Sequence, residues 1–416
     1  MKNKKTLFRL SLLASVLITA ATCASAKKPT YAANIYTESN QSENMIIHFG
    51  QKGDGSLVEL ERVPTGGAGT NGFNHVTGEK SAPDSLVSAG AVTLSADHRF
   101  LFAVNAGDNS ISSFTVDKNG NLKLKDRQPT GEKGYPNSLT YNDRTKTLYA
   151  LHSFGPHHIR TFRVTGGKLH NTGKAYTINT PAFPNRIPTQ IISSPDNRFV
   201  LVDVLFNAPP KAGPDGPILT PSNNGTADGV VVFPVAKDGQ LENAIFNDAG
   251  AVTPFSLHFI NNSRTFVNAS AAGNGAIIST LTDDGKLKNS TLATVDLSAA
   301  PDGPSETCWV SISPDNKYAF VTNFGLSNLT SIDISKSNPE IAKDNQGYVK
   351  GDGTFKGLAG IPTSGPNDSW ASSNGYLYQL YPNASELVAY KMNGAALDVV
   401  GSYAIPYNST VGLVGF

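Results

Sequence analysis

A degenerate repeat runs along this chain, and its two clearest copies start at Ser194 and Ser313. Each copy has a Ser-Pro-Asp-Asn turn, then a basic residue, then an apolar run, at residues 199–202 and 318–321. A polar turn that leads into an alternating apolar run predicts a hairpin entering a buried strand. Weaker copies of this turn lie at residues 95–100, 142–146, 261–264 and 373–376.

A second turn, which contains glycine, follows several of these hairpins. It occurs at residues 118–121, 165–168, 237–240 and 283–286. Four short strands per unit, at a period somewhat above the roughly 40 to 50 residues of one blade, are the signature of a β-propeller. With both chain ends counted, the repeat predicts an all-β fold: a seven-bladed β-propeller of four-stranded blades.

The first unit begins near residue 34 and has no inner strand before it. Residues 409–416, at the other end of the chain, have the apolar character of such a strand. We therefore expect the C-terminal strand to complete the first blade. A ring closed in this way has two fewer exposed sheet edges.

Residues 1–26 have the pattern of a secretory signal peptide. Basic residues precede an apolar run that is too short to span a bilayer, and Ala24-Ser25-Ala26 fits the small-x-small cleavage rule. Cys23 raises lipoprotein processing as an alternative, but Thr22 stands where that site has a smaller residue. We expect cleavage before Lys27, one propeller domain over residues 27–416, and export to a periplasm or to the medium.

The mature chain would carry 30 Lys and Arg against 33 Asp and Glu, a net charge of −3. This balance provides no basic field for nucleic acid or for an anionic membrane, and we expect neither as a partner. Cys308 would be the one cysteine, so no intramolecular disulfide could form. Trp309 and Trp370 are the only tryptophans, too few for the docking motif of quinone-dependent propellers. We expect no cofactor and a monomer.

The two faces of the predicted ring differ in their loops. On one face the turns are tight, of the Ser-Pro-Asp-Asn and Asp-Gly kinds. The other face, here called the loop face, carries the connections between second and third strands and the crossings between blades. Long irregular loops on a rigid scaffold usually carry binding residues, so the site is expected there, around the central channel. These loops are residues 64–84, 127–136, 156–158, 207–229 and 347–368.

Residues at the strand ends of the loop face should form a mostly neutral ring of hydroxyl and amide groups. Such a lining suits a polyhydroxy or carbonyl ligand, and it equally suits a hydrated channel held by structural hydrogen bonds. The candidate ligand-binding residues are Asn105, Asp203, Ser256, Ser270, Asn323 and Tyr381.

Residues 318–323, Tyr-Ala-Phe-Val-Thr-Asn, are close to a Y-V-T-N signature and follow a Ser-Pro-Asp-Asn turn. With this turn and strand motif, the chain resembles the seven-bladed lactonase family, which includes bacterial 6-phosphogluconolactonases and fungal carboxymuconate lactonising enzymes. The resemblance extends from about residue 32 to residue 416 by repeat architecture. It implies a secreted hydrolase of small lactones or sugar-acid esters.

The chain departs from that family at the motifs tied to activity. Where relatives commonly have P-R-H-x-x-F-H-P, residues 254–261 have Phe255 and Ser256 in place of the Arg and the first His. A P-H-x-H pattern is replaced by residues 186–190, and the N-E pair has no clear match near residues 268–270. The usual Arg, His and Glu pattern is therefore not retained.

Four residues are the candidate substitutes. His258 and His152 could act as the base toward a lactone carbonyl, Glu306 could act as an acid, and Arg186 could hold an anion. A structural histidine explains His258 as well, and a carboxylate that binds loop amides explains Glu306 equally well.

Cys308 and a cluster of three histidines are not assigned to the site. Cys308 lies in a segment directed at the mouth, but a lone cysteine in a β core is usually a small apolar residue. His152, His157 and His158 lack the fixed spacing of a metal site, and no metal is assigned.

Two functional classes remain open. The first is the lactonase. The second is a non-catalytic propeller that binds a small ligand or a protein partner on the same face.

Overall fold

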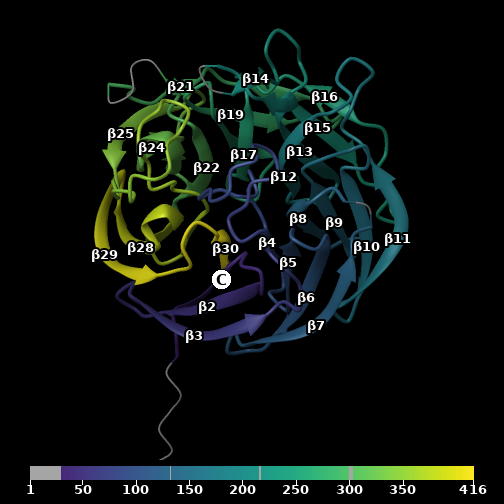
Figure 1. Cartoon of the computed structure of the whole chain (residues 1–416), viewed down its shortest axis with the longest axis horizontal. Helices are drawn as coiled ribbons and strands as arrows, with labels where there is room; N and C mark the ends of the chain where they lie inside the picture. Colours follow the sequence, from purple (N-terminus) through teal and green to yellow (C-terminus); the bar gives the residue numbers. More distant parts are fainter. Residues whose placement is uncertain (1–29, 132, 215–216, 299–302) are drawn as a thin grey trace, which may run out of the picture. The chain divides into compact units, whose positions relative to one another are not determined.

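Seven antiparallel sheets stand around a common axis, each with one edge strand nearest the centre (Figure 1). The computed structural model describes residues 30–131, 133–214, 217–298 and 303–416. The expected leader, residues 1–26, lies outside these ranges, whereas residues 31–416 form one compact unit. Each sheet has a path of four strands, so the predicted seven-bladed propeller is confirmed.

The strands of each blade are given from the centre outward. Blade 1 holds β30 (Val411–Gly415), β1 (Ala33–Glu38), β2 (Met45–Gln51) and β3 (Leu57–Pro64). Blade 2 holds β4 (Val92–Leu94), β5 (Phe100–Asn105), β6 (Ser110–Val116) and β7 (Leu122–Pro129). Blade 3 holds β8 (Pro136–Asn142), β9 (Thr147–His152), β10 (Ile159–Thr165) and β11 (Lys168–Tyr176). Blade 4 holds β12 (Ile187–Ser193), β13 (Phe199–Lys211), β15 (Val230–Pro234) and β16 (Ile245–Asn247), with β14 (Ile218–Pro221) paired to β13.

The remaining blades follow the same plan. Blade 5 holds β17 (Pro254–Phe259), β18 (Thr265–Ser270), β19 (Gly275–Leu281) and β20 (Leu287–Asn289), with β21 (Ala293–Thr294) paired to β19. Blade 6 holds β22 (Thr307–Ile312), β23 (Tyr318–Asn323), β24 (Asn328–Asp333) and β25 (Glu340–Gln346). Blade 7 holds β26 (Ser369–Ala371), β27 (Tyr376–Tyr381), β28 (Glu386–Asn393) and β29 (Ala396–Ala404). Two 3₁₀ turns, η1 (Phe324–Leu326) and η2 (Pro382–Ala384), follow β23 and β27.

The Ser-Pro-Asp-Asn turns explain why these segments fold as hairpins. The Ser194 hydroxyl donates to Asp196 (2.7 Å) and accepts the Phe199 N–H (3.0 Å), which closes the turn. Asn197 takes the left-handed conformation that the turn requires, with φ of 58°. Asparagine reaches that region more readily than most residues do. The same bonds recur at the turn of blade 6, which begins at Ser313.

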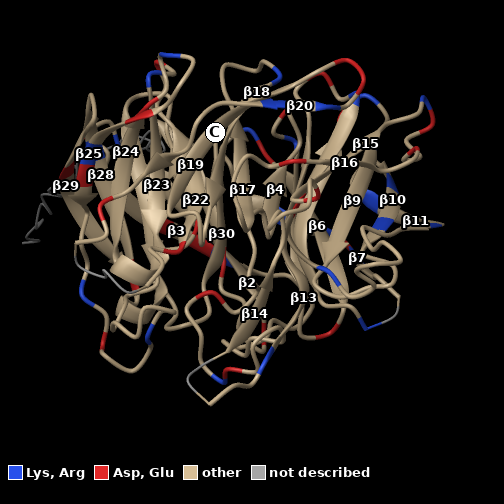
Figure 2. Cartoon of the chain, turned by 90° about the horizontal axis from the view of Figure 1, so that it is seen from above, with Lys and Arg blue, Asp and Glu red and all other residues tan. Residues whose placement is uncertain are grey.

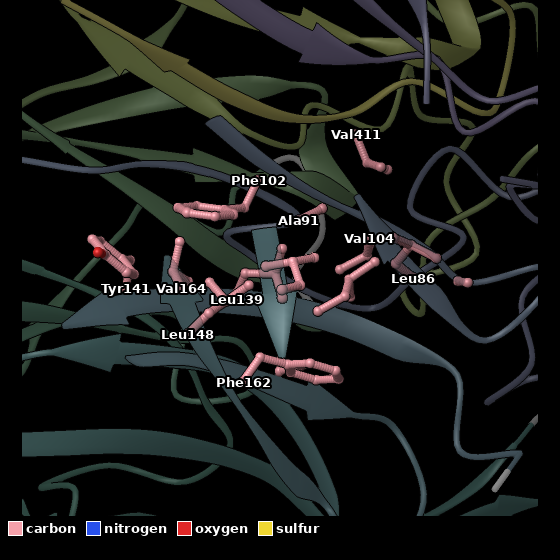
Figure 3. Packing of buried hydrophobic residues seen from close by; sticks show 14 residues of the cluster. Leu86, Ala91, Phe102, Val104, Leu139, Tyr141, Leu148, Phe162, Val164 and Val411 are labelled. Atoms are coloured by element: carbon pink, nitrogen blue, oxygen red, sulfur yellow. The ribbon is translucent and has the colours of Figure 1, made fainter. Parts of the chain in front are cut away.

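Apolar side chains fill the space between neighbouring blades. Figure 3 shows one such cluster, in which Phe102 of blade 2 packs with Leu139, Leu148 and Phe162 of blade 3. Each of these side chains is at most 2% exposed. Burial of this kind contributes roughly 1.5–3 kcal/mol per large side chain. The middle strands carry apolar residues on both faces because each sheet is covered on both sides. Charged residues lie in the loops of the two faces and on the outer strands (Figure 2).

A hydrogen bond from a strand side chain to a turn carbonyl links neighbouring blades near the tight-turn face. Tyr36 donates to Gly120 O (2.7 Å), Tyr149 to Gly239 O (2.7 Å) and Tyr378 to Gly55 O (2.9 Å). In each case the acceptor lies in the glycine turn of the next blade. Three other interfaces have a comparable bond, from Ser113 to Gly167, from Asn247 to Gly285 and from Ser331 to Ala395.

The C-terminal strand closes the ring, as predicted. β30 pairs antiparallel with β1, and Asn34 and Phe416 exchange both backbone hydrogen bonds at 2.9 and 3.0 Å. On the other side, the Asp368 carboxylate at the entry to blade 7 accepts the Gly412 N–H at 2.8 Å. β30 therefore joins the first blade to the last.

Deletion of residues 409–416 should prevent this closure. The deletion removes the inner strand of blade 1 and exposes the edge of β1, so the truncated protein should be insoluble or strongly destabilised. Thermal unfolding of the two proteins, followed by circular dichroism, measures the difference. A melting temperature equal to that of the intact chain would contradict the role given to β30.

Candidate functional site

A segment of the chain crosses the centre of the ring at the loop face (Figure 1). This mouth segment, residues 83–90, joins blades that are not neighbours. The Trp309 indole of blade 6 donates to Ser88 O (3.1 Å), the Ala89 N–H donates to Thr189 O of blade 4 (3.1 Å), and the Ser88 hydroxyl donates to Asn137 O of blade 3 (2.7 Å). Asn367 of blade 7 donates to Pro83 O (3.1 Å). The channel mouth is therefore occupied by the chain itself.

The polar residues that enter the inner strands hold neighbouring blades together. Ser138 donates to Ala89 O (2.6 Å), Thr189 to Phe255 O (2.6 Å) and Ser256 to Cys308 O (2.7 Å). These bonds use the hydroxyl protons that a polyhydroxy ligand would need. Of the two interpretations of this ring, structural hydrogen bonding is the one that these contacts support.

A pocket of about 310 Å³ lies beside the mouth segment, toward blades 4 to 6. Its size is that of a small-molecule site. Its walls come from the crossings between blades 1 and 2 and between blades 6 and 7, from the hairpin of β13 and β14, and from the entries to β17 and β22. We call it the loop-face pocket. Its apolar lining residues include Leu205, Phe206, Phe255, Trp309, Phe324 and Phe355.

Glu306, one of the four candidate catalytic residues, lines this pocket. Its Oε2 accepts the Leu358 N–H at 2.9 Å. Gly325 and Gly357 make room for the carboxylate, because a Cβ at either glycine would lie only 2.6 or 2.3 Å from Oε2. Burial raises the pKa of Glu306 to about 7, and the nearby charge of Glu79 acts in the same direction. A carboxyl with this pKa can take up and release a proton at neutral pH.

Asp84 is a second carboxyl in the pocket, and sequence reasoning did not single it out. It is 8% exposed, and its Oδ1 has no hydrogen-bond partner. Burial raises its pKa well above the usual range, although the amides of residues 86–88 bind it and oppose the shift. Burial also raises the pKa of Cys308, and the charges of Glu306 and Asp84 add to this. Both carboxyls therefore lie near the sulfur, and the thiol stays protonated and weakly nucleophilic.

The backbone is strained at three places around this pocket. Val87, Thr253 and Glu306 have φ of 50°, 51° and 53°, in the left-handed region. This conformation is a true outlier for β-branched residues such as Val87 and Thr253. Strain of this kind costs on the order of 1–3 kcal/mol per residue and tends to occur at functional sites. Its presence in three pocket residues supports the pocket as the candidate site.

The other three candidate catalytic residues lie elsewhere. His152 is fully buried in β9 and contacts His158 O through Nδ1 (3.0 Å), and burial lowers its pKa to about 3. Arg186 is buried, is ion-paired with Asp228 and lies over the rings of Phe183 and Phe246. Neither is among the residues that line the pocket.

His258 lies on β17, two residues beyond Ser256 and on the same side of the strand. This places it roughly 7 Å farther toward the tight-turn face. Its side chain is exposed. Desolvation by the surrounding protein lowers its pKa, and a hydrogen bond to the Val310 backbone opposes this shift. His258 is also not among the lining residues. The structure thus does not bring the four candidates together, and their action as one set stays a prediction.

The six candidate ligand-binding residues are buried and hydrogen-bonded within the protein. Asn105 donates to Ser110 and Ser112, and Asn323 makes the matching bonds to Asn328 and Thr330. The other bonds run from Asn268 to Asp203, from Ser256 to Cys308 O, from Ser270 to Val252 O and from Tyr381 to Gly347 O. None of the six is among the described residues that line the loop-face pocket.

Among the described residues, no group of three or more His, Cys, Asp or Glu side chains is placed to hold a metal ion. No described helix has the length and apolar character needed to cross a bilayer.

Residues 35–185 match the family model "Lactonase, 7-bladed beta-propeller". The predicted resemblance to that family is thereby confirmed. The comparison with curated proteins gave no match.

Solved structures share the fold at low sequence identity. A periplasmic gluconolactonase of Pseudomonas aeruginosa is 15% identical, with a TM-score of 0.67 over 92% of this chain and 98% of that one. A candidate 6-phosphogluconolactonase of Bacteroides fragilis is 16% identical, with a TM-score of 0.64 over 92% and 98%. A protein from Lactobacillus plantarum is 13% identical, with a TM-score of 0.63 over 92% and 99%. These matches show the propeller fold.

Asp203 allows a test of the buried carboxyl groups. Burial raises its pKa to about 7, so the folded protein retains a proton that the unfolded chain releases above about pH 4. Its contribution to stability is complete below pH 4 and is lost as the pH rises toward 7. The advantage of Asp203→Asn over the wild type in unfolding free energy should therefore increase by on the order of 1–4 kcal/mol from pH 5 to pH 8.

Urea unfolding at the two pH values measures this gain. The exposed Glu242→Gln is the control for removal of a surface carboxylate. An Asp203→Asn effect that is the same at both pH values would contradict the raised pKa.

Proposed function

We propose that this protein is an exported hydrolase of small lactones that acts in the loop-face pocket. The observation that carries the proposal is Glu306, a carboxyl with a pKa of about 7 in a strained backbone position inside an apolar pocket. The family match over residues 35–185 supports lactone chemistry. Two structural neighbours, a gluconolactonase and a candidate 6-phosphogluconolactonase, point in the same direction.

The residues in the pocket can carry out the hydrolysis of a lactone. Ionised Glu306 takes a proton from water while the water oxygen forms a bond to the lactone carbonyl carbon. The carbonyl oxygen gains the electron pair, and protonated Asp84 donates a hydrogen bond to it. As the carbonyl re-forms, the ring C–O bond breaks, and the ring oxygen takes the proton from Glu306. The product is the open-chain hydroxy acid, which completes the addition of one water.

Replacement of Glu306 by Gln removes the base but keeps the shape of the side chain. We expect kcat to fall by about 10²- to 10⁴-fold, with a melting temperature that is not lowered, because removal of a buried carboxylate should stabilise the fold as at Asp203. In the wild type, kcat/KM should rise with pH up to about 7, as Glu306 loses its proton. Glu340→Gln, an exposed carboxylate on the outer strand of blade 6, is the matched control.

The same assay on His258→Ala and His152→Ala tests the other candidate bases. If either variant loses activity while Glu306→Gln retains it, the assignment of the base to Glu306 is wrong. A wild-type protein that binds lactones but converts none of them would favour the second candidate, a non-catalytic binding propeller. The loss of the family's Arg and His at Phe255 and Ser256 is the observation that favours this alternative.

Export is part of the proposal and rests on the sequence of residues 1–26. Expression with the leader in a bacterial host should yield an exported protein whose N-terminus is Lys27. Intact-mass spectrometry of the purified protein measures the cleavage site. A retained leader, or a lipid on Cys23, would contradict the assignment.

A further inference from the structure

We propose that the loop-face pocket selects uncharged, largely apolar lactones and rejects lactones that carry a phosphate or a carboxylate. This inference rests on the proposed function and specifies its substrate class.

The walls form a rigid aromatic surface. Phe255 packs edge-on against Trp309 with ring centroids 4.6 Å apart, and Phe324 follows at 6.1 Å from Trp309. Phe355 continues the row at 5.7 Å from Phe324. Leu205 and Phe206 of β13 also line the pocket. A surface of this kind favours ligands in proportion to the apolar area that they bury.

Apart from the carboxyl groups, the polar side chains of the lining that could recognise sugar hydroxyls are already hydrogen-bonded. The Trp309 indole N–H donates to Ser88 O, the Asn74 amide to Asp84 O and the Thr253 hydroxyl to Val252 O. A polyhydroxy ligand would lose its hydrogen bonds to water on entry without matching replacements, which disfavours its binding.

The charges in the pocket disfavour anions. Three of its lining residues are carboxylic acids, Glu79, Asp84 and Glu306, whereas the one cationic side chain in the described lining is the exposed Lys356. A phosphate or carboxylate would lie near the negative charges of Glu79 and ionised Glu306 in an apolar surrounding, which raises its electrostatic energy. A neutral lactone avoids this cost, and it places a carbonyl near Glu306 and Asp84.

The pocket volume of about 310 Å³ exceeds what a bare five-membered lactone ring fills. An alkyl substituent on the ring can therefore extend along the aromatic wall. Each buried methylene contributes about 0.8 kcal/mol, so kcat/KM should rise about fourfold per added methylene until the pocket is full.

The test has a kinetic and a binding measurement. The kinetic measurement compares a series of γ-lactones with lengthening alkyl chains against glucono-δ-lactone and its 6-phosphate. The binding measurement uses Trp309 fluorescence in the Trp370→Phe variant, which leaves Trp309 as the chain's single tryptophan. Trp370 lies against Tyr378 in blade 7 and does not line the pocket. If this variant does not fold, competitive inhibition by the same compounds replaces the fluorescence titration.

A charge-adding variant tests the electrostatic step directly. Ala272 is exposed and lines the pocket, so Ala272→Lys adds a cation there. It should raise the relative kcat/KM for the phosphorylated lactone at least tenfold. Ala96→Lys, on the tight-turn face, adds the same charge away from the pocket and should leave this ratio unchanged.

The outcomes separate this inference from the proposed function. Hydrolysis that favours the phosphorylated lactone, with no gain along the alkyl series, overturns the substrate class and leaves the hydrolase standing. Chain-length-dependent binding of the alkyl lactones without turnover supports the ligand class and overturns the hydrolase. Absence of both binding and turnover for every alkyl lactone overturns the inference.

Discussion

The hydrogen bonds between β30 and β1 are the constraint on which the rest of the structure depends. Seven radial sheets bury both faces only if every sheet has two neighbours, and the last pair of neighbours exists because residues 411–415 return to the first blade. The Asp368 bond to Gly412 joins the same strand to blade 7. The loop-face pocket combines residues of blades 4 to 6 with the crossing from blade 1 to blade 2. Its walls are therefore held in register by the closed ring.

The mouth segment fills the channel mouth at the loop face. Ser88 and Ala89 bind blades 3, 4 and 6, of which only blades 3 and 4 are neighbours, and Ala89 O accepts the Ser138 hydroxyl of blade 3. The ligand space that remains lies to one side and is bounded by apolar loops. The site thus has the polarity of a protein core and only a few carboxyl groups, an arrangement that enhances electrostatic effects on a bound carbonyl.

The sequence was sufficient for the fold because the repeat is local. Ser194, Asp196 and Asn197 make the turn bonds within five residues of one another, and any copy of the pattern implies the same hairpin. The pocket could not be predicted in this way, since the bond from Trp309 to Ser88 joins positions 221 residues apart. The asparagines at the strand ends did carry a usable signal. Asn105 and Asn323 each bind polar residues five and seven positions later, which marks a structural role.

The left-handed backbone at Val87 and Thr253 has a consequence for how this protein can vary. Glycine would relax the backbone at either position, so two substitutions that relieve strain lie in the walls of the pocket. Each would also loosen a wall that the strained residue now holds in one shape. Selection for a more stable fold and selection for a defined cavity therefore oppose each other at the same two residues.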